Sequence, residues 1–230
     1  MHSDESSGSL SRRELLIGAA TTAAAASVIP AAPARAQTSP HFDVQRFVED
    51  CRAANQGAAD AQSAVQEVLA RAMSSPRAVL NGVGEPHKGG IQTLFRSPAL
   101  TILNIVWSPL MQLMPHEHNM WALIGIYTGR EDNIFWQRRE GRLAAATATA
   151  ISAGSVTPLP RDVIHSVSNP IEKLTGAIHI YGGDFFAVPR SEWDPETLAE
   201  RAWSVQGALA LFEQSNERFF GFKNGGACAR

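Results

Sequence analysis

Two histidines separated by a single residue, His116 and His118, are the residues of this sequence with the clearest potential for chemistry. In a β-strand successive side chains point to opposite faces, so the two imidazoles would share one face and form half of a metal site. Apolar stretches flank the pair at 102–106 and 121–127, which favours the interior of a β-barrel. Two surface histidines would have the same spacing, so the interpretation requires a third ligand.

His165 supplies a third imidazole in a stretch that resembles the second motif of the cupin family, G-x5-P-x-G-x2-H-x3-N. Asp162 stands where that motif has its second glycine. The positions that match are Gly154, Pro160, His165 and Asn169.

The first cupin motif, G-x5-H-x-H-x3-E-x6-G, matches at both members of the histidine pair and at Gly129. Leu110 replaces its leading glycine, and Ala122 replaces its glutamate ligand. The resemblance implies an all-β fold, the double-stranded β-helix of the cupin jelly-roll barrel, with flanking N- and C-terminal helices. It also implies a metal site made of three histidines without a carboxylate.

Three neutral imidazoles leave a divalent ion with its full charge and with open positions. Such a centre favours an anionic donor such as a thiolate, and it can accept dioxygen if the metal is Fe(II). The stretch 115–118, together with Tyr127, Gly129, His179 and Tyr181, resembles cysteine dioxygenase and its bacterial relatives that act on 3-mercaptopropionate.

That family places a Ser-x-His-x-Tyr triad beside the iron. This chain keeps His179 and Tyr181, which would share one face of a strand, but it has Ala177 in place of the serine. The resemblance implies that Tyr181, oriented by His179, is catalytic. The alternative is an ordinary pair of core residues on a barrel strand.

The family also binds a substrate carboxylate with an arginine on a strand before the histidine pair, and Arg96 is the best match. A guanidinium suits a carboxylate because it offers a planar fork of two N–H donors. A surface role for Arg96 is the alternative.

The resemblance therefore predicts an Fe(II)-dependent thiol dioxygenase, which oxidises a small thiol such as cysteine or 3-mercaptopropionate to a sulfinate with O2. Two other hypotheses stay open. One is a cupin with a metal other than iron, acting as an isomerase or hydrolase, since three histidines also suit zinc. The other is a cupin that binds a ligand through its metal without catalysis.

The composition indicates one domain with a substantial core, because the chain has 230 residues of which 44% are hydrophobic. The formal net charge is −2 and there is no run of basic residues, so we expect a small-molecule partner and no nucleic acid.

The N-terminal segment, 1–36, resembles a twin-arginine signal peptide. Arg12 and Arg13 precede an alanine-rich apolar run, and Ala34 and Ala36 form a cleavage site of the Ala-x-Ala type. We expect export by the twin-arginine machinery to a bacterial periplasm, without a stable membrane anchor. A retained N-terminal anchor is the alternative.

The mature chain divides into N-terminal helices and a loop (37–90), the cupin barrel (91–190) and a C-terminal helix with a tail (191–230). Helical spacing predicts two helices within 42–73, and glycines and prolines predict a loop over 76–90. Short apolar runs predict strands between 92 and 188, the last of them at 185–188.

Asp194 followed by Pro195 predicts the start of a helix that ends near Phe220. An oxidising compartment would permit a disulfide between the two cysteines, Cys51 and Cys228, and two unpaired thiols are the alternative.

Overall fold

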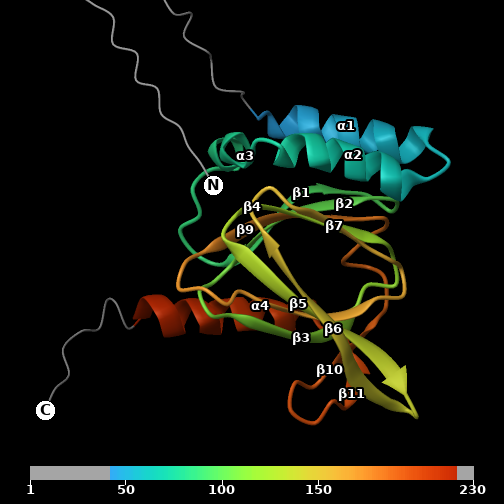
Figure 1. Cartoon of the computed structure of the whole chain (residues 1–230), viewed down its shortest axis with the longest axis vertical. Helices are drawn as coiled ribbons and strands as arrows, with labels where there is room; N and C mark the ends of the chain where they lie inside the picture. Colours follow the sequence, from blue (N-terminus) through green and yellow to red (C-terminus); the bar gives the residue numbers. More distant parts are fainter. Residues whose placement is uncertain (1–41, 222–230) are drawn as a thin grey trace, which may run out of the picture. The chain divides into compact units, whose positions relative to one another are not determined.

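The apolar strands form two antiparallel sheets that face each other in Figure 1. This computed structural model describes residues 42–221, so the expected signal peptide and Cys228 lie outside the described residues. One sheet has the order β1-β2-β9-β4-β7, and the other has the order β11-β10-β3-β8-β5-β6. The all-β prediction is confirmed, because this is the double-stranded β-helix barrel with helices added at both ends.

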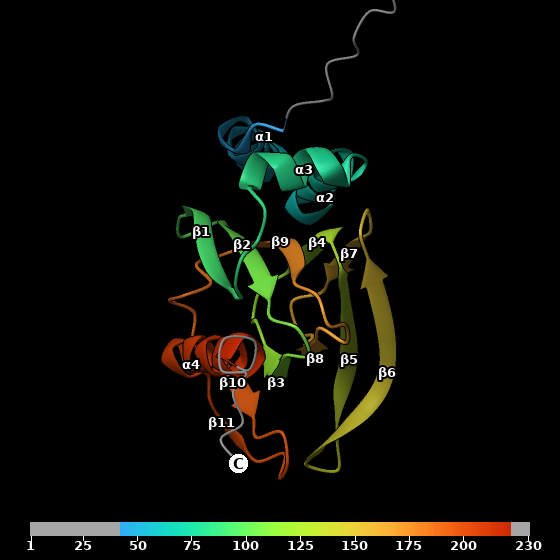
Figure 2. The ribbon, with the colours of Figure 1, turned by 90° about the vertical axis from the view of Figure 1, so that its left-hand side faces the viewer.

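The strand boundaries follow the predicted apolar runs closely. The first sheet contains β1 (Gly90–Arg96), β2 (Thr101–Trp107), β9 (Thr175–Tyr181), β4 (Ala122–Thr128) and β7 (Val156–Leu159). The second sheet contains β11 (Glu200–Ala202), β10 (Ser191–Trp193), β3 (Gln112–Glu117), β8 (Ile164–Ser168), β5 (Arg130–Arg139) and β6 (Arg142–Ser152). Figure 2 shows β5 and β6 as a long hairpin along one side of the barrel.

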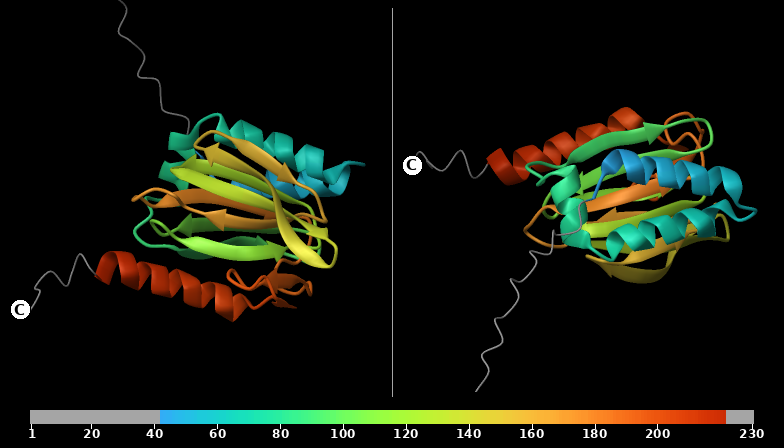
Figure 3. Two further views of the ribbon diagram at one scale, coloured as in Figure 1. Left: turned by 60° about the horizontal axis from the view of Figure 1, so that its bottom comes forward. Right: turned by 90° about the horizontal axis from the view of Figure 1, so that it is seen from above.

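Three helices cover the outer face of the first sheet, as Figures 2 and 3 show. They are α1 (Val44–Gly57), α2 (Ala61–Met73) and α3 (Pro76–Val83). The carboxylates of Asp43 and Asp60 accept hydrogen bonds from backbone N–H groups in the first turns of α1 and α2, which fixes where those helices begin. The two helices predicted within 42–73 are confirmed.

The prediction of a loop over 76–90 is wrong for its first half, which is α3. Pro76 occupies the first turn of that helix, where its missing N–H would have no partner in any case. Val79 and Leu80 are buried on the face of α3 that is turned toward the sheet. Tertiary packing therefore stabilises this short helix. No helix among residues 42–221 is long and apolar enough to cross a membrane.

The central strands β4 and β9 are buried on both faces, which sorts their side chains into two cores. Leu123 and Ile178 face the helices, whereas Ile124 and Tyr181 point into the barrel. At Gly125 a Cβ atom would lie 2.9 Å from Leu69 of α2, so only glycine allows this close approach of helix to sheet. Because side chains of β9 alternate between these two cores, His179 and Tyr181 both point into the barrel.

The long helix predicted from Asp194 is wrong in its starting point. The carboxylate of Asp194 accepts N–H bonds from Glu196 and Thr197, but these close a turn between β10 and β11. The helix α4 (Val205–Asn216) begins only after Ser204, whose hydroxyl accepts from the N–H of Gly207. A five-residue π-helical segment (Glu217–Gly221) then follows it.

The strand predicted at 185–188 is a turn. The carbonyl oxygen of Asp184 accepts hydrogen bonds from the N–H groups of Ala187 and Val188, so this segment has no strand partner. The turn leads into Arg190 and β10 beside the barrel interior.

Leu110 stands where the first cupin motif has its leading glycine, and its backbone has a φ of +57°. A branched side chain is strained in this left-handed conformation. Gly129, the other motif glycine, has a φ of +79°. The motif position thus keeps the conformation that favours glycine although the residue has changed.

Candidate metal centre

Three histidines converge inside the barrel. The strands β3 and β8 are neighbours, and their register pairs His116 directly with His165. The Nε2 atom of His118, just beyond β3, lies 3.2 Å from Nε2 of His116 and 3.2 Å from Nε2 of His165. The ligand atoms of the three residues all lie within 4.8 Å of one another. The structure therefore brings together the three residues predicted as metal ligands.

Hydrogen bonds on the far side of the rings fix how two of these histidines are protonated. His116 Nδ1–H donates to the carbonyl oxygen of Met114 at 3.0 Å, and His165 Nδ1–H donates to Oδ1 of Asn133 at 2.6 Å. A neutral imidazole with its proton on Nδ1 leaves Nε2 as a bare acceptor. Both Nε2 lone pairs therefore point to the centre of the cluster.

Burial keeps the cluster uncharged. It lowers the pKa of His116 to about 4, and it holds the pKa values of His118 and His165 well below the ordinary range, with the neighbouring histidines as the next cause. When all three Nε2 atoms are bare, as metal binding requires, their converging lone pairs repel one another unless a cation lies between them. Two nitrogens bound tetrahedrally at 2.0–2.1 Å to one zinc ion would lie about 3.4 Å apart. The observed 3.2 Å contacts therefore suit a divalent metal ion.

His179 and Tyr181 line the barrel cavity next to this cluster. Nδ1 of His179 lies 3.3 Å from the hydroxyl oxygen of Tyr181, and the Tyr181 ring meets the ring of His118 edge-on at 5.1 Å between centroids. Burial raises the pKa of the Tyr181 hydroxyl, so this group stays protonated at neutral pH and can donate a hydrogen bond. The structure thus places the predicted catalytic pair against a predicted ligand.

A buried carboxylate that sequence reasoning missed connects the two groups. Glu131 is fully buried, and its Oε1 accepts from the side-chain amide of Asn133 at 3.0 Å. Its Oε2 accepts from the indole N–H of Trp107 at 2.7 Å and lies 3.3 Å from Nε2 of His179. Asn133 in turn accepts a hydrogen bond from His165. Glu131 is thus connected to the predicted ligand His165 through Asn133, and it lies beside His179 directly.

Sequence reasoning also missed a buried arginine, Arg190, which lies over two aromatic rings near the cluster. Arg190 is 6% exposed, and its Nη1 donates to the backbone carbonyls of Phe185 and Val188. Its Nε and Nη2 atoms are buried without a hydrogen-bond partner among the described residues. The guanidinium stacks over Phe185 and Trp203, and the Trp203 ring lies 5.1 Å from the ring of His116.

Two donors without partners on a buried guanidinium can bind an anion, and Arg190 lines an outer pocket of about 430 Å³, whereas the cavity beside the histidines does not include it. Burial lowers the pKa of Arg190 to about 10, so the group still carries its charge at neutral pH. Because Nε and Nη2 lie on one edge of the planar fork, they match the two oxygens of a carboxylate. An unpaired buried charge is costly, and a bound anion would offset this penalty.

Arg96 occupies a different environment from Arg190. It ends β1, and its Nε and Nη2 donate to both carboxylate oxygens of Asp184 at 2.9 and 3.0 Å. The side chain of Arg96 is 49% exposed, and its guanidinium also lies over the ring of Phe186. The donors predicted to bind a substrate carboxylate are thus occupied by a carboxylate of the protein.

The space beside the histidines is small and mostly apolar. A cavity of about 20 Å³ is lined by His116, His165, His179 and Tyr181 together with apolar side chains. This is room for one or two small ligand atoms before any side chain moves. A larger groove of about 370 Å³ runs over the outer face of β3, β5 and β8 beside Ile134, and it contains none of the clustered histidines.

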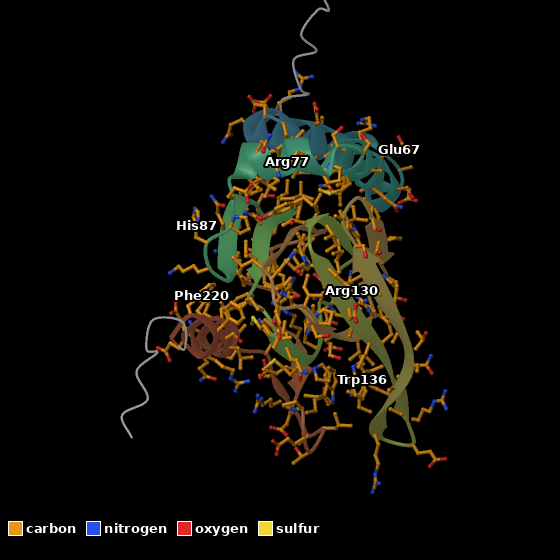
Figure 4. All side chains as sticks on the ribbon, turned by 60° about the vertical axis from the view of Figure 1, so that its left-hand side comes forward. Glu67, Arg77, His87, Arg130, Trp136 and Phe220 are labelled. Carbon is orange, nitrogen blue, oxygen red and sulfur yellow. The ribbon has the colours of Figure 1, made fainter. Side chains whose placement is uncertain are left out.

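The remaining described candidates lie outside the cluster. His87, in the loop before β1, is exposed on the outer surface, away from the barrel interior (Figure 4). Cys51 is a free thiol buried in α1, and burial raises its pKa to about 12. It therefore lacks the thiolate character that a catalytic cysteine needs.

The sequence contains a pattern from which the inward-facing positions of Glu131 and Asn133 could have been predicted. In β5 these polar residues occupy the buried positions while Ile134 is 41% exposed, which reverses the usual alternation of an antiparallel strand. Two inward polar residues on a barrel strand indicate a polar interior. Arg190 carries no comparable signal, because it lies in a connection without periodicity.

The sequence matches no family model and no curated protein. Among the solved structures to which the chain is similar, two are described as cupin proteins and a third as an oxalate decarboxylase. An RmlC-like cupin family protein of Methanocaldococcus jannaschii has 13% identity and a TM-score of 0.38, over 44% of this chain and 86% of that chain. A cupin superfamily protein of Desulfitobacterium hafniense has 15% identity and a TM-score of 0.37, over 46% and 88%. A variant of Bacillus subtilis oxalate decarboxylase has 16% identity and a TM-score of 0.36, over 44% and 27%.

Proposed function

We propose that this protein is an Fe(II)-dependent thiol dioxygenase, which oxidises a small thiol that carries a carboxylate, such as cysteine or 3-mercaptopropionate, to its sulfinate. The observation that carries the proposal is the set of three convergent neutral histidines together with the half-paired, buried guanidinium of Arg190, which lies over the Trp203 ring that in turn contacts His116. One site would thus bind two anionic groups of a small molecule.

The charges of the site favour such a substrate. A divalent ion held by three neutral imidazoles keeps its charge of +2, and Arg190 adds a further positive charge. The buried Glu131 offsets one of these charges. A ligand with a thiolate and a carboxylate carries two negative charges and neutralises the remainder, which matters because uncompensated charge is unfavourable in a buried site.

Each residue of the site has a separate role in this proposal. Arg190 binds the carboxylate, and the Tyr181 hydroxyl, oriented by His179, donates a hydrogen bond to the ligand atoms at the metal. The apolar cavity wall excludes water and selects small ligands. His116, His118 and His165 would hold an Fe(II) ion, which would supply the redox chemistry for joining dioxygen to sulfur. The protein contributes proximity and orientation.

The reaction balances without a further reductant. The thiol R–SH and O2 give the sulfinic acid R–SO2H, in which both oxygen atoms are bonded to sulfur and the sulfur has supplied all four electrons. No additional electron donor is therefore needed in the cavity.

The first test is oxygen uptake by anaerobically purified protein that has been reconstituted with Fe(II). Cysteine, 3-mercaptopropionate and cysteamine serve as substrates, with metal content measured on the same sample and sulfinate identified by mass spectrometry. The proposal expects uptake with the two carboxylate-bearing thiols. If an iron-loaded sample takes up no oxygen with any of the three thiols, the oxidation of these thiols is refuted.

The three-histidine ligand set also favours a second candidate, a zinc-dependent hydrolase or isomerase, because the same ligands occur in catalytic zinc sites. Metal content after expression in iron- and zinc-supplemented media separates the two candidates. A protein that is fully loaded and inactive in both forms would support a role in ligand binding without catalysis.

For the whole chain we propose export to a periplasm through the twin-arginine route. Support comes from Arg12 and Arg13, the apolar run that follows them and the cleavage site at Ala34 to Ala36. N-terminal sequencing of the protein from a periplasmic fraction tests this proposal, and an uncleaved chain in the membrane fraction would refute it.

A further inference from the structure

We infer that Glu131 is a positioning residue that sets the direction of every hydrogen bond between the metal ligand His165 and the outer pair His179 and Tyr181. This inference rests on the proposed metal centre and adds to it the residue that keeps both sides in their working tautomers.

The three polar neighbours of Glu131 can all present N–H groups to it. Its Oε1 accepts from Nδ2 of Asn133 at 3.0 Å, and its Oε2 accepts from Nε1 of Trp107 at 2.7 Å. Nε2 of His179 lies 3.3 Å from Oε2 without meeting hydrogen-bond geometry, and it is buried with no hydrogen-bond partner among the described residues, so Oε2 is the acceptor within reach of its proton. An ionised carboxylate is the side chain that can only accept, so it suits all three neighbours at once.

Through Asn133, the carboxylate of Glu131 determines which ring nitrogen of His165 carries the proton. Because Asn133 turns its Nδ2 toward Glu131, its Oδ1 faces Nδ1 of His165 at 2.6 Å. The oxygen requires a proton on Nδ1, and His165 is left with a bare Nε2 toward His118. Carboxylate groups behind a ligating histidine act in this way, and their loss commonly weakens metal binding about 10–100-fold.

The same carboxylate also determines which ring nitrogen of His179 carries the proton, and so how His179 meets Tyr181. A proton on Nε2 of His179 points to Glu131 and leaves Nδ1 bare, 3.3 Å from the Tyr181 hydroxyl. The hydroxyl of Tyr181 has a single proton, which either Nδ1 of His179 or a ligand in the cavity accepts, and Nδ1 itself cannot donate to the hydroxyl. Glu131 thus provides the orienting contact for His179 on a strand where Ala177 has no polar side chain.

The substitution Glu131→Gln makes a specific prediction because an amide has one acceptor and one donor end. Trp107 Nε1 can only donate, so the amide oxygen must stay on that side and the NH2 group must face Asn133. Asn133 then has to reverse its own amide, which turns an N–H toward Nδ1 of His165. His165 must move its proton to Nε2, where it competes with the metal.

The experiment measures Co(II) affinity by visible absorption, and it determines histidine tautomers by long-range 15N–1H NMR on the metal-free protein. The expected result for Glu131→Gln is Co(II) binding weakened about 10–100-fold, with the proton of His165 moved from Nδ1 to Nε2. The matched control Asp132→Asn makes the same change on the neighbouring exposed carboxylate, which pairs with Arg130. It should leave both readouts unchanged.

An unchanged Co(II) affinity together with an unchanged His165 tautomer in folded Glu131→Gln would overturn the inference. If that variant does not fold, the wild-type protein still decides the question. The inference requires the proton on Nδ1 of His165 and on Nε2 of His179, and the opposite tautomer of either would refute it. These readouts do not use thiol oxidation, so an inactive but metal-binding protein refutes the proposed reaction and leaves the inference standing.

Discussion

Replacing Arg190 tests whether this protein recognises a substrate carboxylate. The variant Arg190→Met keeps an apolar stem between Phe185 and Trp203, and it removes the Nε and Nη2 donors that are buried without partners. We expect kcat/KM to fall for cysteine and 3-mercaptopropionate. Cysteamine, which has no carboxylate, should lose much less activity.

The expected size follows from the contacts. A hydrogen bond to a charged group contributes about 1.5–3 kcal/mol. A bidentate contact from two buried donors is therefore worth about 3 kcal/mol after allowance for imperfect geometry, which is roughly a 150-fold loss of kcat/KM. The variant Arg190→Lys should recover only part of this loss, since an ammonium keeps the charge but lacks the planar fork.

Oxygen-uptake kinetics with the three thiols measures the change in kcat/KM. Thermal unfolding of the same variant measures how much stability the substitution removes. Unfolding is needed because Nη1 of Arg190 also donates to the carbonyls of Phe185 and Val188. The matched control is Arg96→Met, which removes a guanidinium that is already paired with Asp184. If Arg96→Met abolishes the preference for carboxylate-bearing thiols while Arg190→Met preserves it, the assignment of Arg190 is wrong.

Four further predictions concern the centre and the helical layer. His165→Ala should lose metal and activity together, and metal content at the wild-type level would remove this residue from the ligand set. Tyr181→Phe should retain metal and slow turnover about 10- to 100-fold through the loss of one donor, and unchanged turnover would exclude the hydroxyl. Cys51 should resist alkylation at pH 8 until the protein is denatured, because a pKa raised to about 12 keeps the thiol neutral; peptide mapping checks this. A folded-state pKa above the unfolded value stabilises the fold at lower pH, so stability should fall as pH rises from 9 toward 12, which urea titrations at several pH values measure.

Much of the barrel could be predicted because strand alternation is a local property. Side chains two positions apart share a face whatever the rest of the chain does, so His116 and His118, and likewise His179 and Tyr181, could be placed together. The sequence also indicated a barrel with flanking helices, and β4 and β9, which these helices cover, are buried along nearly their whole length.

The C-terminal elements could not be predicted in the same way. Asp194 followed by Pro195 is typical of a helix start, but the same side-chain contacts also close a tight turn. The choice depended on the pairing of β10 with β3 and β11, where Glu192 lies beside His116. A local pattern does not report such a pairing.

The sequence by itself determined the all-β class and the shared face of His116 and His118, because strand alternation acts over a few residues, and the motif resemblance added His165 as the third candidate ligand. Only the tertiary structure decided which charged groups surround them. Glu131 reaches His179 across the barrel, and Arg190 rests between Phe185 and Trp203, which come from separate segments. Contacts of this kind depend on how the sheets close on each other, and no periodicity along the chain encodes them.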